Sequence, residues 1–398
     1  MAARATPLRM TAILVLLWTL SGAAYGCVLP FISVYAAHQG LSVPQIGLLG
    51  AVSACAAAVA QPLVGRLLDR RGCRRLLLCG ASITAAMGYG LLGHAESGPL
   101  ILACTAVGGV GFFGARLVVI AVTLNAIESG AGAHAAFARF RLCPSAGFTV
   151  TGTAGGLLLG HISFALLFSV GGLLFVAMAL GSLALPPPAP RHDRLTAVAE
   201  GRPGDTRLAR RVLLTLSLMS VLYGIVGSSS DTYLPLLLRH LHGSYALVGL
   251  ASTIGAVVEI PLMLVVGLLA ARLSPAVVLL LGMSVVPLRV ALFAIVPAAT
   301  PLLAAQALDG WTFSVFAIIG VTIVADQTPR ADRAWSLGIY AGAGTIGPII
   351  GPLAAGFLAA RIGIQPMFGL VALVGVAVPF SLVVGLWPLL CGRPTTAR

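Results

Sequence analysis

The sequence predicts an all-α membrane protein in which twelve transmembrane helices form two pseudo-symmetric bundles of six. Three observations lead to this prediction. First, 59% of the 398 residues are hydrophobic and only 9% are charged, which leaves far more apolar surface than the core of a soluble protein could bury. Second, the charged residues gather in short breaks between long apolar runs. Third, the second half of the chain repeats features of the first half.

The apolar runs are each long enough to cross a bilayer, which takes about 20 residues of helix. The first run follows two arginines and contains small residues from Ser21 to Ala24, as a secretory signal does. It continues past Cys27 to Ala37, which is too long for a signal, so we expect it to remain as the first span. The breaks delimit twelve expected spans, at about residues 11–37, 44–68, 76–95, 99–125, 140–160, 162–186, 211–238, 245–270, 275–296, 299–324, 334–360 and 364–390.

The segment from Gly65 to Arg75 interrupts the apolar pattern most sharply, because it contains five arginines and one aspartate. It lies between the second and third spans, and we expect the chain to turn at Gly65 and Gly72 because glycine has no Cβ. All 24 basic residues are arginine, and only Arg239 and Arg361 fall in loops on the opposite side. Since cytoplasmic loops carry an excess of basic residues, both termini are expected in the cytoplasm. The net charge of +13 is therefore attributed to orientation in the membrane and not to a nucleic-acid partner.

The internal repeat indicates two related halves. Leu29-Pro30-Phe31 in the first half is echoed by Leu234-Pro235-Leu236 in the second. We expect residues 1–186 and 211–398 to form the two six-helix bundles, joined by a cytoplasmic linker at 187–210 that is rich in proline and charge. Parallel repeats of this kind occur in transporters whose substrate site lies near the membrane midplane, between halves that rock.

This plan resembles the major facilitator superfamily over essentially the whole chain. The loop after the second span matches the gating motif of that family, which has a glycine, an aspartate followed by a basic residue, a second glycine and further basic residues: Gly65, Asp69, Arg70, Gly72 and Arg74. Cys73 stands where a basic residue is usual, and Ala271 stands where the aspartate would be in the second-half copy. The resemblance implies a transporter of the major facilitator fold in which this motif controls the cytoplasmic gate.

Shorter segments are similar to the sugar-efflux and oligosaccharide-symporter branches of the superfamily. Glu259-Ile260-Pro261 resembles the sugar-efflux pattern of the eighth span. The stretch from Phe137 to Phe148 resembles the entry to the fifth span of the symporters, where an arginine and an aromatic residue take part in sugar binding. The resemblance therefore implies Arg141 and Phe148 as sugar contacts.

Ionisable residues inside the spans are the candidates for proton coupling. Each costs about 3 kcal/mol on insertion scales unless it faces a cavity or a partner. A carboxylate in a low-dielectric cavity can bind and release protons near neutral pH. The segments around Arg289 and Asp309 also resemble the ninth- and tenth-span positions that carry coupling in the symporters, with Asp309 where a histidine is usual. We expect coupling to involve three carboxylates and one counter-charge: Asp231, Glu259, Asp309 and Arg289. A purely structural ion pair remains the alternative for these residues.

Aromatic and basic side chains inside the spans are the expected substrate contacts, since a sugar ring packs its apolar face on an aromatic ring. The candidates are Arg141, Phe148, Arg116, Trp311 and Tyr233, with Tyr223 and Tyr340 as further aromatic residues. Each aromatic can instead serve ordinary packing or the interfacial belt.

Other chemistries find little support in the sequence. Three GxGxxG runs begin at Gly88, Gly109 and Gly342, but all lie inside apolar spans and none follows a strand, so close helix packing explains them better than a nucleotide site. The seven cysteines are scattered without a CxxC pair, and His240 and His242 read as an interfacial pair. HExxH and GxSxG are absent. We expect no metal, no cofactor and no enzymatic activity.

The sequence thus favours a proton-coupled secondary transporter of a small solute, with export of a sugar or glycoside by alternating access as the preferred function. A drug or natural-product exporter is the alternative, which Arg116 in the fourth span fits, although the Gln-Gly that follows this arginine in drug antiporters is missing. A receptor-like protein that no longer moves solute is a third reading. The expected partners are the solute, protons and lipid, and we expect a monomer in a bacterial inner membrane.

Overall fold

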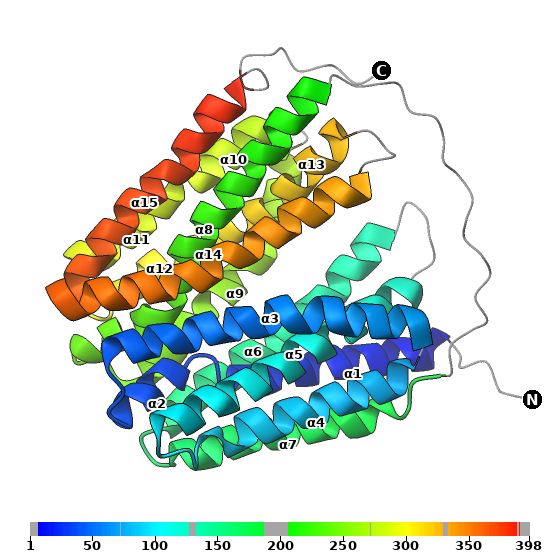
Figure 1. The fold of residues 1–398 in the computed structure, drawn as a ribbon, viewed down its shortest axis with the longest axis vertical. Coiled ribbons are helices and arrows are strands. Elements are labelled where there is room, and N and C mark those ends of the chain that lie inside the picture. Colours follow the sequence, from blue (N-terminus) through cyan, green and yellow to red (C-terminus); the bar gives the residue numbers. More distant parts are fainter. Residues whose placement is uncertain are drawn as a thin grey trace, which may run out of the picture. The chain divides into compact units, whose positions relative to one another are not determined.

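The computed structural model describes residues 7–71, 73–126, 133–186, 206–270, 272–328, 333–387 and 390. All regular structure in these ranges is helical (Figure 1). Ten helical segments of the described chain are long and apolar enough to cross a membrane. α1 and α6 are further long helices of the described chain, so the helix order is consistent with twelve spans. The predicted fold class is thereby confirmed.

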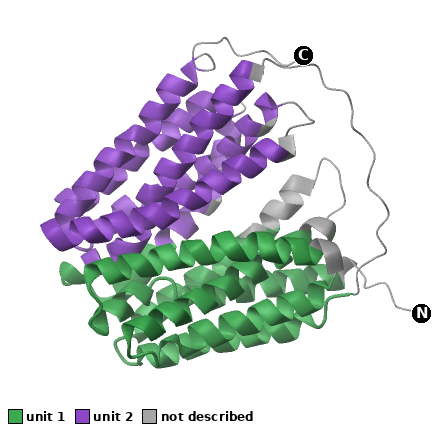
Figure 2. Ribbon diagram, in the orientation of Figure 1, with its two compact units in different colours: residues 1–191, 238–253 green, residues 192–237, 254–398 purple. Residues whose placement is uncertain are grey.

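The chain divides into two compact units, which Figure 2 shows in different colours. Unit 1 comprises residues 1–191 and 238–253, and unit 2 comprises residues 192–237 and 254–398. The predicted assignment of 1–186 and 211–398 to two bundles with a linker at 187–210 stays a prediction, and residues 187–205 of that linker lie outside the described ranges.

Unit 1 contains seven described helices: α1 (Pro7–Gly26), α2 (Ile32–His38), α3 (Val43–Arg71), α4 (Arg74–Leu92), α5 (Gly98–Ala126), α6 (Ala133–Leu158) and α7 (Phe164–Ser182). The first predicted span is therefore two helices, because the chain turns between Gly26 and Ile32. The Tyr35 hydroxyl on α2 donates to the Ala95 carbonyl at 2.9 Å and fixes this short helix against the end of α4. Ser163 caps α7 by accepting from the Leu166 amide, as N-cap serines do.

The rest of the chain contains the helices α8 (Thr206–His240), α9 (Tyr245–Ala270), α10 (Pro275–Met283), α11 (Val285–Ile295), α12 (Leu302–Val315), the π-helical turn η1 (Phe316–Gly320), α13 (Val321–Gln327), α14 (Arg333–Ile362) and α15 (Ile364–Gly385). The ninth predicted span is interrupted at Ser284, and the tenth is interrupted by η1. α8 and α9 each contribute residues to both units, because the unit boundaries fall at residues 237–238 and 253–254.

Glycines bring α4 and α5 into close contact. A Cβ on Gly88 would lie 2.7 Å from the Cys104 carbonyl oxygen, and a Cβ on Gly111 would lie 2.7 Å from the Ala81 carbonyl oxygen. Small residues at such crossings let helices pack closely in a membrane, where van der Waals contact largely drives association. The glycine runs that match GxGxxG in this region therefore serve helix packing.

The expectation of a turn at Gly65 is wrong. Gly65 lies inside α3, which continues to Arg71. A single glycine costs a helix only about 1 kcal/mol, and this long helix carries its regular hydrogen bonds through that position. Gly72, the other expected turn residue, lies outside the described ranges.

Candidate functional site

A buried ion pair joins two helices of unit 2. Nη1 of Arg289 on α11 lies 2.6 Å from Oδ1 of Asp309 on α12. Nη2 of the same guanidinium donates to Oε1 of Gln306 at 2.8 Å. Arg289 is 2% exposed and Asp309 is 27% exposed, so the cation is enclosed and the carboxylate is partly accessible. The expected pairing of Arg289 with a carboxylate is thus present, while its role in transport stays a prediction.

The helical spacing of α12 positions the partners of Arg289. Gln306 and Asp309 are three residues apart, which places both side chains on the same face of the helix. Phe293, one turn after Arg289 on α11, presents its ring 5.5 Å from the guanidinium carbon and shields it further. An enclosed guanidinium is expensive unless it is paired and hydrogen bonded, so these neighbours are required for the arginine to sit inside the bundle.

α9 packs closely against α12 at the level of Asp309. A Cβ on Gly255 of α9 would lie 3.5 Å from Oδ2 of Asp309, and a Cβ on Gly310 would lie 2.8 Å from the Glu259 amide nitrogen. The Ser314 hydroxyl donates to the Glu259 backbone carbonyl at 3.3 Å. Glu259 is half-buried on α9, so a second expected coupling residue lies on a helix that touches the Asp309 segment.

Asp231 on α8 belongs to the same electrostatic cluster. Its side chain is exposed, and it interacts electrostatically with both Asp309 and Arg289. We call Asp231, Arg289 and Asp309 the charge cluster. Arg289 pairs with Asp309, and Asp231 interacts electrostatically with both, so the cluster carries one excess negative charge when both carboxylates are ionised. Such an arrangement can hold one exchangeable proton.

The expected substrate residues of unit 1 fall into different environments. Phe148 on α6 is half-buried, with its ring centroid 6.4 Å from that of Tyr25. Tyr25 in turn stacks on Phe112 with centroids 3.9 Å apart and planes 11° apart. Arg116 on α5 is exposed. The side chain of Arg141 lies outside the described ranges, so its closeness to Phe148 stays a prediction.

The expected substrate residues of unit 2 also differ from each other. Trp311 is half-buried on α12, two residues after Asp309. Tyr233 on α8 is fully buried, and its hydroxyl donates to the Pro352 carbonyl of α14 at 3.1 Å. Tyr233 therefore joins α8 to α14. Its ring is not exposed, so the structure gives no support to its predicted role as a substrate contact.

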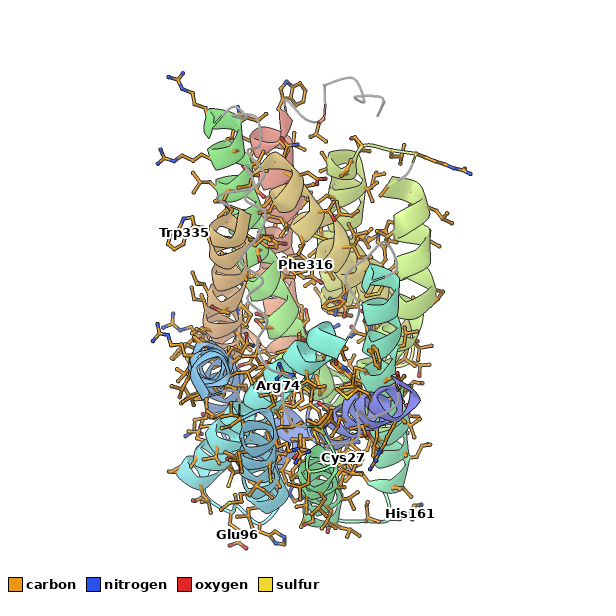
Figure 3. All side chains as sticks on the ribbon, turned by 90° about the vertical axis from the view of Figure 1, so that its right-hand side faces the viewer. Cys27, Arg74, Glu96, His161, Phe316 and Trp335 are labelled. Carbon is orange, nitrogen blue, oxygen red and sulfur yellow. The ribbon has the colours of Figure 1, made fainter. Side chains whose placement is uncertain are left out.

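Part of the gating motif lies outside the described ranges. This applies to the side chains of Asp69 and Arg70 and to the whole of Gly72. Arg74 is the first residue of α4 and is half-buried (Figure 3). The neighbouring Arg75 donates from Nε to the Leu185 carbonyl, which ties the start of α4 to the residues that follow α7.

Two residues near the charge cluster were missed by reasoning from the sequence. Gln306 holds Arg289, and Phe316 lies with its ring centroid 4.6 Å from that of Tyr223. Gln306 could have been found as a polar residue one turn before Asp309 inside an apolar run. Phe316 gave no signal, because an aromatic residue in a span is usually packing. In the described residues, no group of three or more histidine, cysteine or acidic side chains is placed to hold a metal ion.

The chain matches known transporters along most of its length. The profile of the MFS_1 like family matches residues 12–370. A protein of Deinococcus radiodurans whose name proposes sugar efflux is 27% identical over 376 residues, which cover 87% of this chain and 90% of that protein. An uncharacterized MFS-type transporter of Mycobacterium tuberculosis is 27% identical over 360 residues, covering 85% and 84%. The crystal structure of the nucleoside transporter NupG is similar with a TM-score of 0.79 at 16% identity, covering 95% of this chain and 99% of that one.

Proposed function

Because the chain belongs to the MFS_1 like family of transporters, which are not enzymes, we propose that it is a proton-coupled exporter of a sugar or glycoside. As a family member it is a multi-pass membrane protein that handles a small-molecule substrate. The proposal adds three points: coupling to protons, a sugar as the solute, and export as the direction. It also places the protein in a bacterial inner membrane as a monomer with both termini in the cytoplasm.

The charge cluster is the observation that carries the proposed coupling. A proton carrier needs a group that titrates and that is held in a low-dielectric site beside a counter-charge. Asp309 is a partly accessible carboxylate that pairs with an enclosed arginine at 2.6 Å. A proton on Asp309 neutralises the carboxylate, which weakens the ion pair between α11 and α12. Asp231 then becomes the remaining carboxylate with which Arg289 interacts.

The exchange of partners couples protonation to movement. α8, α11 and α12 each supply one member of the charge cluster, so a change of partner alters the forces between these helices. Glu259 lies on α9 beside the same segment and serves as a further coupling carboxylate in this scheme. The solute takes part in the other half of the transport cycle. The carrier moves solute in one direction and then returns in a different protonation state.

The preference for a sugar rests on two supports. The Deinococcus radiodurans relative carries a name that proposes sugar efflux. In unit 1, Tyr25, Phe112 and Phe148 form an aromatic group of the kind on which the apolar face of a sugar ring packs. The proposed contacts are four of the residues expected from the sequence: Arg141, Phe148, Arg116 and Trp311. Tyr233 is left out of the proposal because its ring is buried and its hydroxyl donates to the Pro352 carbonyl.

A drug exporter is the second candidate, and one observation favours it. Asp231 is an exposed carboxylate inside a transmembrane helix, and an amphipathic cation would be attracted to it. A neutral sugar uses the same carboxylate differently, as an acceptor for its hydroxyl groups. The two solutes can therefore be separated by their charge.

The experiment uses purified protein in proteoliposomes with an imposed pH gradient. Lactose, methyl β-D-glucoside and the cationic dye ethidium are offered outside vesicles with an acidic lumen. Antiport predicts that a sugar accumulates inside while protons leave, and that collapse of the gradient stops the accumulation. If ethidium accumulates in the vesicles and neither sugar does, the protein is a drug exporter instead. Sugar entry that ignores the gradient would remove proton coupling.

Variants locate the coupling within the same assay. We expect Asp309→Asn, Asp231→Asn and Glu259→Gln to lose gradient-driven accumulation and to retain part of the sugar exchange, because binding and rocking do not require proton release. Asp326→Asn is the matched control, since Asp326 is an exposed carboxylate of unit 2 on α13. Full accumulation in all three test variants would contradict the assignment.

A further inference from the structure

Three aromatic rings of unit 2 contact one another beside the charge cluster. The Phe316 ring centroid lies 4.6 Å from that of Tyr223 on α8, with an angle of 32° between the planes. It lies 6.2 Å from that of Tyr340 on α14, with an angle of 40°. Phe316 is the first residue of η1 (Figure 3). We call Tyr223, Phe316 and Tyr340 the aromatic triad.

The π-helical turn shapes the aromatic triad. η1 runs from Phe316 to Gly320, and turns of this kind are rare and occur frequently at functional sites. A Cβ on Gly320 would collide with the Tyr340 hydroxyl, so this glycine leaves the room that the hydroxyl occupies. The π-helical turn in the tenth span therefore contains the glycine that makes room for the Tyr340 hydroxyl.

The Tyr340 hydroxyl is buried but takes part in no hydrogen bond within the described chain. Tyr340 is 6% exposed. The hydroxyls of Tyr35 and Tyr233, which are also buried, donate to the carbonyls of Ala95 and Pro352. A buried polar group without a partner costs about 1–3 kcal/mol, so packing alone gives no reason to keep this hydroxyl.

The aromatic triad is connected to the charge cluster through α12. Tyr223 interacts through its hydroxyl with the Thr312 side chain. The Thr312 hydroxyl in turn donates to the Asp309 backbone carbonyl at 3.1 Å. Asp309 is the residue that pairs with Arg289. A ligand that moves Tyr223 would therefore act on the segment that carries the ion pair.

We propose that the aromatic triad is a subsite for the ring of a neutral pyranose, with the Tyr340 hydroxyl hydrogen bonding to the sugar. The inference rests on the proposed sugar export and deepens it by naming the surface that binds the sugar ring. Tyr223 and Phe316 are half-buried, so part of each ring can be covered by the apolar face of a sugar. The same contact links occupancy of the subsite to the charge cluster through Tyr223.

The charges around the aromatic triad select against an anionic solute. Arg289 is 2% exposed and is already engaged by Asp309 and Gln306, so it cannot receive an anion without losing these partners. Asp231 is exposed and would repel a negative group. A neutral polyol has hydroxyls that can donate to a carboxylate and an apolar ring face that can stack, which fits both features.

The test measures equilibrium binding of radiolabelled lactose and radiolabelled mannitol to the purified full chain. Mannitol carries sugar hydroxyls but has no ring face. We expect wild-type protein to prefer lactose, and Phe316→Ala to weaken lactose binding about three- to tenfold through lost stacking. Phe380→Ala is the matched control, since Phe380 is 65% exposed on α15.

Tyr340→Phe separates a ligand contact from a packing role. This variant keeps the ring and removes a hydroxyl that the described chain does not use, so its melting temperature should stay at the wild-type value or rise. We expect lactose binding to weaken about three- to tenfold, as for a lost hydrogen bond. Tyr35→Phe, which removes a hydroxyl that donates to a carbonyl in unit 1, should bind lactose normally.

The outcomes distinguish the subsite from the proposed function. Normal lactose binding in both Phe316→Ala and Tyr340→Phe would overturn the subsite while leaving sugar export intact. Binding of ethidium that depends on Phe316, with no lactose binding by the wild-type protein, would overturn both. Weaker lactose binding in both variants, with wild-type melting temperature in Tyr340→Phe, is the result that supports the subsite.

Discussion

Nη1 of Arg289 lies 2.6 Å from Oδ1 of Asp309, and this contact ties α11 to α12 inside an apolar bundle. The guanidinium cannot reach water, because Arg289 is 2% exposed and its other terminal nitrogen is held by Gln306. The pair therefore behaves as a unit: each charge is tolerated inside the bundle because the other is present. This property has consequences for stability as well as for transport.

The first prediction concerns the stability of the ion pair. Asp309→Asn leaves an enclosed guanidinium without its counter-charge, and we expect a loss of about 3–5 kcal/mol in the free energy of unfolding. The double variant Arg289→Leu/Asp309→Asn removes both charges and should recover most of that loss. Thermal unfolding in detergent gives the comparison. Equal destabilisation in the single and double variants would show that the pair does not act as a unit.

The second prediction concerns Phe148. Phe148→Ala removes a half-buried ring beside Tyr25, and we expect lactose to bind about three- to tenfold more weakly. Arg141→Lys should also weaken binding, because a point charge replaces a bidentate fork. The measurement is equilibrium binding of radiolabelled lactose, with expression and melting temperature as controls. Unchanged affinity in both variants would leave Arg141 as an anchor for orientation and Phe148 as packing.

The third prediction concerns Asp69 of the gating motif, whose role follows from the sequence. A carboxylate at the cytoplasmic end of a span can interact with the positive end of another helix and hold the cytoplasmic side closed. We expect Asp69→Asn to reduce the maximal rate of lactose exchange while the half-saturating concentration stays near the wild-type value. Arg66→Gln serves as the control for a general loss of charge in this segment. A wild-type maximal rate in Asp69→Asn would remove the gate role from this residue.

The fourth prediction concerns the contact between α4 and α5. Gly111→Ala places a Cβ against the backbone of Ala81 and Ala85, and we expect a destabilisation of about 1–3 kcal/mol from overpacking. Gly80 lies on the same helix pair, but a Cβ there would meet nothing within 4 Å. Gly80→Ala should therefore change the free energy of unfolding by less than about 1 kcal/mol. Similar melting temperatures for the two variants would contradict the packing role of Gly111.

The sequence was sufficient for the overall architecture because hydropathy and arginine placement reflect where the chain crosses the bilayer. It was also sufficient to indicate that Arg289 would meet a carboxylate, since an arginine inside a span requires one. Local interruptions were not predictable in the same way. The break between Gly26 and Ile32 lies in a continuous apolar run. Pro30, which has no backbone N–H to donate, lies within it, and Tyr35 of the helix that follows donates to the Ala95 carbonyl.

The details around Asp309 depend on tertiary contacts that no spacing rule supplies. The ring contact between Phe316 of η1 and Tyr223 of α8 joins residues far apart in the sequence, and spacing within the tenth span does not indicate which residue of another helix a ring meets. The space for the Tyr340 hydroxyl is likewise created by Gly320 on another helix. The expected turn at Gly65 is wrong for the opposite reason, since a residue that favours turns lies inside a long regular helix.

Proton movement driven by a sugar gradient tests the central claim most directly. Proteoliposomes containing the pH-sensitive dye pyranine receive lactose outside in the absence of any imposed pH gradient. We expect lactose entry to drive protons out and make the lumen alkaline with wild-type protein, and to produce no pH change with Arg289→Leu/Asp309→Asn although lactose still exchanges. Lactose entry through the wild-type protein without alkalinisation, or an undiminished pH change in the double variant, would contradict proton-coupled export through Asp309.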